Sequence, residues 1–413
     1  MDRQLLTEEA QAEIERIGSA DLVIGVPTAG ASPNLADVAA AVRAGLEAHF
    51  SGYQAVVVHV DQAPVEESEA LPAPVWGDVP VVRVRPARTL GGSPVHLGRD
   101  EAVRTTLTAG CTLGARSIVV LNGEITSLTA DWLRGLGSPP LKEDYGLVVP
   151  AYQGHRYEGT LTHALVVPLV RALFGKRLAR PVAEEFGCSA EAAAFFLEQD
   201  VWETDLGRNG IEFWLPPAAI AQGLTIGQAA LGPRRVPALA RPEPLGAVVG
   251  RTAGSLFAIA ERYESLWLER HGSEPVPLFG APPEPLPDSA PVDPERMLVG
   301  FRQGVRDLYP IWERILARDD LSDVLALSDA TADEFRFPDR LWARVVYDFL
   351  LAYRARVVYR SHVAQSLAPL YLGRVASLIL ETRSRPPAAV AEITERLSRE
   401  FEEQKPYLVD RWR

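Results

Sequence analysis

The residue types best suited to chemistry stand directly after apolar segments in the first third of the chain. Thr28 follows LVIGVP, Asp61 follows AVVVHV, and Asn122, Gly123 and Glu124 follow SIVVL. A carboxylate there can accept hydrogen bonds from a base or a ribose, and the N–H groups of glycine-containing loops such as GVPTAG and TLGGS can bind a diphosphate. Turn formation and helix capping explain the same residues, and neither loop is a G-x-G-x-x-G or a Walker sequence.

A second group of polar residues precedes an apolar helix in the middle of the chain. The segment HRYEGTLTH, residues 155–163, contains two histidines, an arginine, a tyrosine, a glutamate and two threonines. A helix start needs one capping side chain, such as that of Thr160, so both a ligand-binding role and a capping role remain open. Lys176 and Arg177 follow in GKRLARPVAEEFG, where single charges are typical of solvated residues or weak ion pairs.

Four apolar segments, each followed by a helical or loop segment, must position these residues. They are predicted to be strands and cover residues 21–30, 54–61, 80–86 and 117–124. Strands that alternate with helices form right-handed strand–helix–strand units and a mainly parallel sheet, with the ligand beyond the carboxyl ends of the strands. The polar residues after the strands therefore lie at the ligand-binding edge of the predicted α/β fold.

The pattern changes in the second half of the chain. Residues 275–294 are dense in proline, which blocks regular backbone hydrogen bonding, so we expect a surface connector there. The residues after it are almost entirely of helical pattern. The predicted organisation is an N-terminal helix over 1–19, an α/β domain over 20–240 and a mainly helical domain over 241–413.

Composition excludes several classes of protein. The 413 residues carry 42 Lys and Arg against 54 Asp and Glu, a net charge of -12, which disfavours nucleic acid and anionic membranes as partners. The two cysteines, Cys111 and Cys188, support neither a disulfide framework nor a structural zinc site. The acidic N-terminus does not resemble a signal peptide, and no stretch has the roughly 18 uncharged apolar residues of a membrane span. We expect a cytoplasmic protein.

In the order of these segments, the chain resembles the retaining GT-A glycosyltransferases that make glucosylglycerate, mannosylglycerate or their phospho forms. LVIGVPTAG is similar to the nucleotide loop of that family, AVVVHVD to its second strand, and SIVVLNGEITSLTADWL to the strand with the metal motif. The segment YEGTLTHALVVPLVRALFGKRLARPVAEEFGCS is similar to the acceptor stretch, NGIEFWLPPAAIAQG to the segment opposite the sugar, and LAPLYLGRVASLILET to the C-terminal helical part. The resemblance implies a Rossmann-like GT-A domain followed by a helical domain.

The resemblance also implies an activity, in which a hexose moves with retention from a UDP- or GDP-linked sugar to a glycerate-like carboxylate acceptor. It assigns the donor side to Pro27, Thr28, Asp61, Gly91, Gly92, Arg99, Asn122 and Gly123. It assigns the acceptor side to Tyr157, Glu158, Gly159, Thr160, Lys176 and Arg177. The residues implied at the reacting centre are Glu124, Glu212, Arg234 and Arg235.

The sequence departs from the family at its metal motif. Relatives use an Asp-x-Asp pair and a later histidine to hold Mg²⁺ or Mn²⁺, whereas this chain has Asn122, Gly123 and Glu124, and then Arg234 and Arg235. Glu124 is the one candidate metal ligand. Two carboxylates, a neutral histidine and a divalent cation sum to zero, but Glu124 and two arginines sum to plus one, so arginine can hold the diphosphate without metal.

Two hypotheses follow from that departure. The first is a metal-independent glycosyltransferase, and the second is a catalytically degenerate protein that binds nucleotide sugars or acts as a scaffold. A nucleotidyltransferase is disfavoured because its glycine-rich loop with Arg and Lys is not evident. In either case we expect a homodimer that forms through the C-terminal helices.

Overall fold

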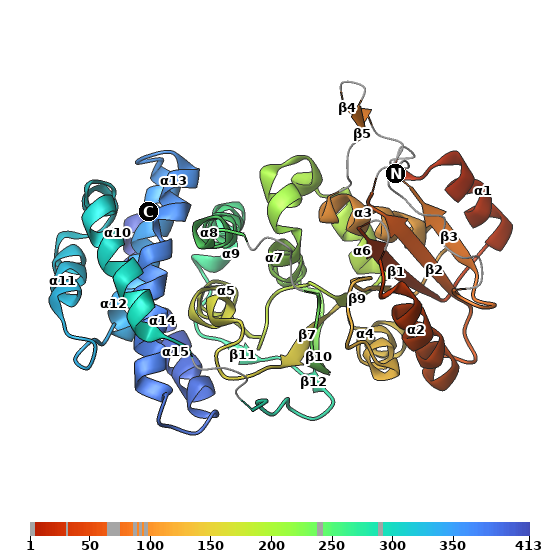
Figure 1. The fold of residues 1–413 in the computed structure, drawn as a ribbon. Coiled ribbons are helices and arrows are strands. Elements are labelled where there is room, and N and C mark those ends of the chain that lie inside the picture. Colours follow the sequence, from red (N-terminus) through yellow and green to blue (C-terminus); the bar gives the residue numbers. More distant parts are fainter. Residues whose placement is uncertain are drawn as a thin grey trace. The chain divides into compact units, whose positions relative to one another are not determined.

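The chain folds into two compact units, each built from segments that are distant in sequence (Figure 1). A computed structural model describes residues 5–29, 32–63, 75–85, 89–90, 93–94, 98–237, 243–287 and 292–413. The first unit comprises Met1–Gln153, Val182–Leu239 and Val276–Pro283. The second comprises Gly154–Pro181, Ala240–Pro275 and Glu284–Arg413. The segment 154–181, which the sequence analysis included in the 20–240 domain, therefore packs with the helices of the second unit.

The first unit contains an eight-stranded sheet with the order β12-β10-β7-β9-β6-β1-β2-β3. The strands are β1 (Leu22–Thr28), β2 (Ala55–Asp61), β3 (Val81–Val84), β6 (Ser117–Val120), β7 (Leu147–Gln153), β9 (Phe186–Ser189), β10 (Ile226–Pro233) and β12 (Leu278–Phe279). Only β9 runs antiparallel to its neighbours within the described part of the sheet. The predicted α/β class with a mainly parallel sheet is confirmed. Strands β4 (Thr89–Leu90) and β5 (Ser93–Pro94) form a separate antiparallel pair.

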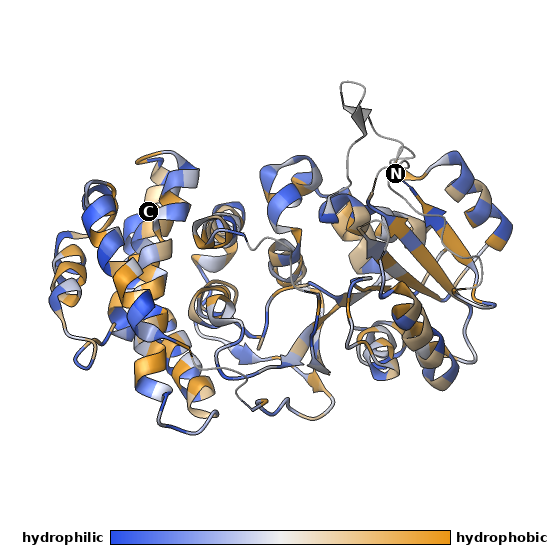
Figure 2. Cartoon of the chain, in the orientation of Figure 1, coloured by the Kyte–Doolittle hydropathy of each residue, from blue (hydrophilic) through white to orange (hydrophobic). Residues whose placement is uncertain are grey.

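Helices cover both faces of this sheet. They are α1 (Glu8–Ile17), α2 (Leu35–His49), α3 (Arg99–Thr112), α4 (Ala130–Lys142), α6 (Ala190–Glu198), the 3₁₀ helix η3 (Asp200–Glu203) and α7 (Asp205–Ala221). Leu22, Ile24 and Val26 of β1 pack in one core with α2 and α4. Gly25 points to the other face, where an added Cβ would lie 2.2 Å from Cγ2 of Thr106 in α3. Strand β1 is buried throughout because it is covered on both sides, and Figure 2 shows this strand as hydrophobic.

The second unit is almost entirely helical. Its helices are the π-helical turn η2 (Thr162–Val166), α5 (Val167–Phe174), α8 (Leu245–Arg262), α9 (Glu264–Trp267), α10 (Pro294–Ile315), α11 (Arg318–Asp329), α12 (Asp339–Ala355), α13 (Arg360–Ser366), α14 (Ala368–Thr382) and α15 (Ala389–Trp412). Gly175, with φ +69°, ends α5 in the left-handed conformation that glycine adopts easily. Trp342 donates its indole N–H to the carbonyl of Ala164 at 2.7 Å, which ties α12 to η2.

The proline-rich segment has more regular structure than a surface connector. Its first residues complete β11 (Glu274–Pro275), which pairs with β8 (Lys176–Arg177), and then form β12 at the edge of the large sheet. Gln228 of β10 donates its backbone N–H to the carbonyl of Pro277 at 2.9 Å. Proline lacks an N–H donor but keeps its carbonyl, so it is compatible with an edge strand.

One helical stretch is long and apolar enough to cross a membrane, although the sequence scan found none. It covers Arg360–Thr382, in which α13 and α14 follow each other, and 83% of its most apolar window is buried inside the protein. A core helix of a soluble protein passes the same test of length and composition, so the stretch fits the core of the helical unit.

Gly187 of β9 offers a test of how closely α4 packs on the sheet. A Cβ at this position would lie 1.9 Å from the carbonyl oxygen of Leu136, a backbone atom that cannot move aside cheaply. We expect Gly187→Ala to lower the free energy of unfolding by about 3 kcal/mol, measured by urea denaturation. The control Gly52→Ala, which has nothing within 4 Å of its Cβ, should change it by less than about 0.5 kcal/mol. Equal stability of the two variants would contradict the packing described here.

Candidate functional site

The candidate site lies where the strand order of the sheet reverses. From β1 the chain builds outward to β2 and β3, and it then returns to the other side of β1 as β6. In open α/β sheets, ligands bind outside the carboxyl ends of the strands at such a switch point. Thr28 and Asp61 are register partners at the ends of β1 and β2, and the N–H of Gly123 donates to the carbonyl of Pro27 at 3.0 Å. The structure thus brings these four predicted donor residues together.

His59, which the sequence analysis does not name, joins this group. Its Nε2 lies 3.0 Å from the hydroxyl of Thr28, and both residues are buried. Asp61 is 5% exposed, and its Oδ1 accepts the N–H of Ala63 at 3.1 Å. Burial lowers the pKa of His59 to about 4, against the opposing effect of the Asp61 charge, so His59 is neutral at pH 7. The sequence does contain a signal for this placement. His59 and Asp61 are two positions apart in a strand, so their side chains lie on the same face of β2.

Asn122 and Glu124 form a tight turn after β6. The side-chain oxygen of Asn122 accepts the N–H of Glu124 at 2.8 Å. Gly123 between them allows close approach to β1, because an added Cβ would lie 2.6 Å from the carbonyl oxygen of Pro27. Among the described residues, no group of three or more His, Cys, Asp or Glu is placed to hold a metal. Glu124 is therefore not part of such a group. These residues do not fit a Mg²⁺ or Mn²⁺ site.

Arg234, at the end of β10, makes a two-point ion pair with Glu185. Its Nε lies 3.0 Å from one carboxylate oxygen and its Nη2 lies 3.1 Å from the other. The Glu185 side chain is 0% exposed and also accepts the hydroxyl hydrogen of Tyr152. Burial alone would lower the pKa of Arg234, but the charges of Glu185 and Glu184 raise it well above its usual value. Arg234 is therefore always charged, and its charge is balanced inside the protein.

Arg235 is in a different environment from its neighbour. It is exposed, and its backbone is held on both sides by the loop that follows β6. Its N–H donates to the hydroxyl oxygen of Ser127 at 2.9 Å, and its carbonyl accepts the N–H of Thr126 at 2.9 Å. The ends of β6 and β10 are thus joined, so that Glu124 and Arg235 lie on two loops in contact.

Arg99 and Glu212, which are also assigned to the donor or the reacting centre, have structural contacts in the first unit. Arg99 donates from Nη2 to the carbonyl oxygen of Glu184, and the carbonyl of Glu212 accepts the N–H of Ala183 at 2.8 Å. Both residues hold the segment that carries Glu185. Gly91 and Gly92 lie outside the residues that the structure describes.

The predicted acceptor residues all belong to the second unit. The Tyr157 hydroxyl lies 3.0 Å from the hydroxyl of Thr382, and the Thr160 hydroxyl lies 2.7 Å from that of Tyr371. Both partners are on α14. These two side chains therefore attach the segment that precedes η2 to the helical core.

The two basic acceptor candidates are also paired. Lys176 forms an ion pair with Glu274, and Arg177 donates from Nε to the hydroxyl of Ser273 and from Nη2 to its carbonyl, both at 3.1 Å. These contacts accompany the short β8–β11 pairing. They link both cations to the segment 273–275.

Gly159 and Glu158 lie in the turn before η2. Gly159 has φ +66°, which favours glycine, and Arg180 and His163 are the nearest side chains to its open side. Burial, together with the charge of Arg180, lowers the pKa of His163 to about 4. Glu158 is exposed and lies 3.8 Å from His155.

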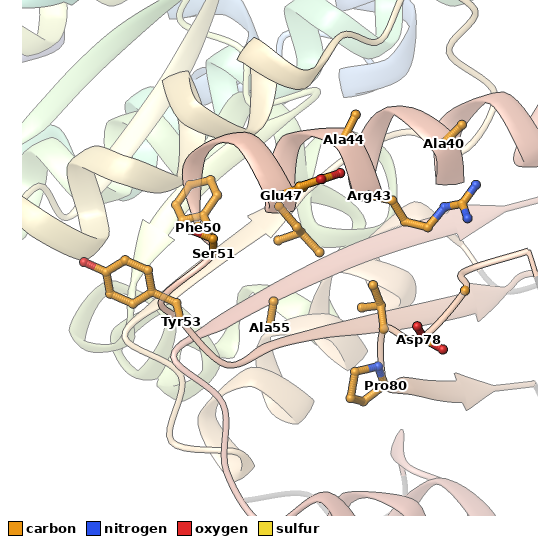
Figure 3. A pocket seen from close by; sticks show the side chains of 13 residues that line it. Ala40, Arg43, Ala44, Glu47, Phe50, Ser51, Tyr53, Ala55, Asp78 and Pro80 are labelled. Atoms are coloured by element: carbon orange, nitrogen blue, oxygen red, sulfur yellow. The ribbon is translucent and has the colours of Figure 1, made fainter.

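A groove at the opposite edge of the sheet is unrelated to these residues (Figure 3). Its volume is about 680 Å³, and it lies between α2 and the turn before β3, with Arg43, Glu47 and Asp78 among its lining side chains. Ala55 and Pro80 of the lining stand at the amino ends of β2 and β3. The groove is therefore at the amino edge, whereas Thr28 and its neighbours are at the carboxyl edge.

No protein-family model matches the sequence, and no curated protein matches it. Solved structures of glucosyl-3-phosphoglycerate synthase from Mycobacterium tuberculosis are similar to the chain. The complex with Mn²⁺, uridine diphosphate and phosphoglyceric acid has a TM-score of 0.41 and 17% identity, over 62% of this chain and 82% of that chain. The complex with phosphoglyceric acid has a TM-score of 0.41 and 18% identity, over 61% and 83%.

The Arg234–Glu185 pair leads to a stability prediction. Arg234→Met leaves a fully buried carboxylate without its cation, so we expect the free energy of unfolding to fall by about 3–5 kcal/mol. The double variant with Glu185→Gln should lose less than the sum of the two single changes, measured by urea denaturation. Arg208→Met removes an exposed ion pair at 3.4 Å and should cost less than about 1 kcal/mol. A loss of similar size for Arg208 and Arg234 would show that the buried pair is not formed.

The buried His59 predicts a loss of stability in acid. Its pKa of about 4 in the folded chain is below the ordinary 6.5, so the unfolded chain binds more protons between these values. The contribution is fully present above pH 6.5 and is lost as the pH falls toward 4. We expect His59→Asn to reduce the fall in stability between pH 7 and pH 5 by about 2 kcal/mol. Thr28→Val, which keeps the histidine, should retain the wild-type pH slope, and an unchanged slope in His59→Asn would contradict the assignment.

Proposed function

We propose that the chain is a glycosyltransferase that moves a hexose from a UDP- or GDP-linked sugar to a glycerate-like carboxylate acceptor with retention. The observation that carries the proposal is the meeting of Thr28, Asp61 and the Asn122–Glu124 turn at the switch point of the sheet. A nucleotide is the ligand class that such an edge accommodates best. The sequence resemblance supplies the transfer reaction, and the low cysteine content supports the cytoplasmic location.

On the donor side, Asp61 would accept hydrogen bonds from the base or the ribose, with Thr28 and neutral His59 beside it. The departing diphosphate gains negative charge during transfer, so the site must direct donors or cations toward it. Arg235 is exposed on the loop that contacts the turn after β6, and it is the cation best placed to meet a ligand there. Arg234 would affect the diphosphate only indirectly, because its charge is paired with that of Glu185.

On the acceptor side, the carboxylate would be bound by residues of the second unit. Lys176 and Arg177 carry the positive charge required, and the Glu158–Gly159 turn lies in the same segment of the chain. A bound carboxylate would compete with Glu274 for Lys176. Assembly as a homodimer through the C-terminal helices belongs to the same proposal.

A second function, nucleotide-sugar binding without transfer, is favoured by two observations. Arg234 is paired with a buried carboxylate. Glu124 is the single carboxylate of a turn that has two carboxylates in the metal-dependent family. Formation of a glycosylated product from UDP-glucose or GDP-mannose with D-glycerate, with and without metal, distinguishes the two functions. Binding without product in every mixture would support the second.

Isothermal titration of UDP-glucose and GDP-mannose tests the donor site. We expect one of them to bind equally well with Mg²⁺, with Mn²⁺ and with EDTA, because protein cations would hold the diphosphate. Asp61→Asn keeps an oxygen for the Ala63 N–H but loses the charge, so it should weaken binding about tenfold. Asp78→Asn, at the opposite edge of the sheet, is the matched control and should bind like the wild type. Strict dependence on metal would overturn the metal-free proposal.

A further inference from the structure

A cavity of about 370 Å³ in the second unit lies between the turn after α9 and the end of α15. Its lining includes the side chains of Arg270, His271, Lys405 and Arg413. The residues of the candidate nucleotide site all belong to the first unit, so this cavity is a different site. Its volume is in the range that accommodates a small organic molecule.

Basic side chains outnumber acidic ones around the cavity. The lining holds Arg270, Lys405 and Arg413 against Glu402 and Asp410. Oε2 of Glu402 lies 2.9 Å from Arg171, which also pairs with Glu395. The side chains of the lining therefore carry more positive than negative charge.

Lys405 is the most buried of the cations that line this cavity. It is 7% exposed, and its ammonium donates to the carbonyl of Arg270 at 2.6 Å, which leaves two of its three hydrogens for other acceptors. Burial and the charge of Arg270 lower the pKa of Lys405 to about 8, against the opposing charge of Glu402. Two cations that repel each other beside a cavity are both stabilised by an anion placed between them.

We propose that this cavity binds a small organic anion through its phosphate or carboxylate group. Lys405 and Arg270 would bind the oxyanion, Arg413 would add a third charged donor, and Leu268 and Val409 would contact the carbon skeleton. The turn that carries Arg270 continues to Ser273, which holds Arg177. An anion in the cavity would thus fix the segment that also positions a predicted acceptor residue.

Isothermal titration of the full chain tests the site with three probes, namely inorganic phosphate, glycerol 3-phosphate and lactate. We expect at least one of these probes to bind. Tighter binding of the two phosphate probes would indicate a phosphate site, and tighter binding of lactate would indicate a carboxylate site. Arg270→Gln and Arg413→Gln should each weaken that binding at least fivefold, because each removes a charge-assisted hydrogen bond. Both residues are partly or fully exposed, so the variants should fold like the wild type.

Two control variants separate this site from others. Arg399→Gln changes an exposed residue on the same helix but outside the cavity, and Arg235→Gln changes the candidate nucleotide site. Both should bind the probe like the wild type. Equal affinity in all four variants, or no binding of any probe, would overturn the proposal. Loss of binding in Arg235→Gln alone would assign the anion to the nucleotide site and would also overturn it.

Discussion

A carboxylate that is fully removed from water has to be neutralised inside the protein, and Glu185 imposes that requirement on the candidate site. Its partner Arg234 comes from the end of β10, and Tyr152 at the end of β7 supplies a further hydrogen bond. Three strands of the sheet therefore meet in one polar cluster at the carboxyl edge, because Glu185 directly precedes β9. Removing Arg234 would leave the buried Glu185 carboxylate without its cation.

This pairing changes the electrostatic argument that the sequence suggests. Counting Glu124, Arg234 and Arg235 alone gives an excess positive charge, but Glu185 cancels Arg234. In the proposed function, Arg235 would then carry the interaction with an anion, because the N–H groups of Gly123 and Glu124 already donate to Pro27 and Asn122. A divalent metal has no suitable set of ligands among the described residues of the edge. The donor site is therefore proposed to bind the diphosphate through the guanidinium group of Arg235.

The candidate donor and acceptor residues belong to different compact units. Segment 154–181 leaves the sheet after β7 and joins helices from the C-terminal half of the chain, where Tyr157 and Thr160 contact α14. The polar residues of this segment thus have two roles. They stabilise the helical unit, and in the proposed function they also bind an acceptor.

The sequence by itself determined the class of fold, and it predicted the edge where a ligand would bind. Apolar runs that end in Thr28, Asp61 and the Asn122 turn are local signals, and parallel strands place their ends together without any knowledge of the remaining chain. Periodicity likewise predicted the helical pattern of the second half. Only the tertiary structure decided how the charges are paired. Glu185 and Arg234 are 49 positions apart in the sequence, and His59 and Thr28 are 31 positions apart. These pairs come into contact because of the order of the strands in the sheet, which local spacing does not reveal. The cavity beside Lys405 depends in the same way on a turn that packs against a helix 135 residues further along the chain.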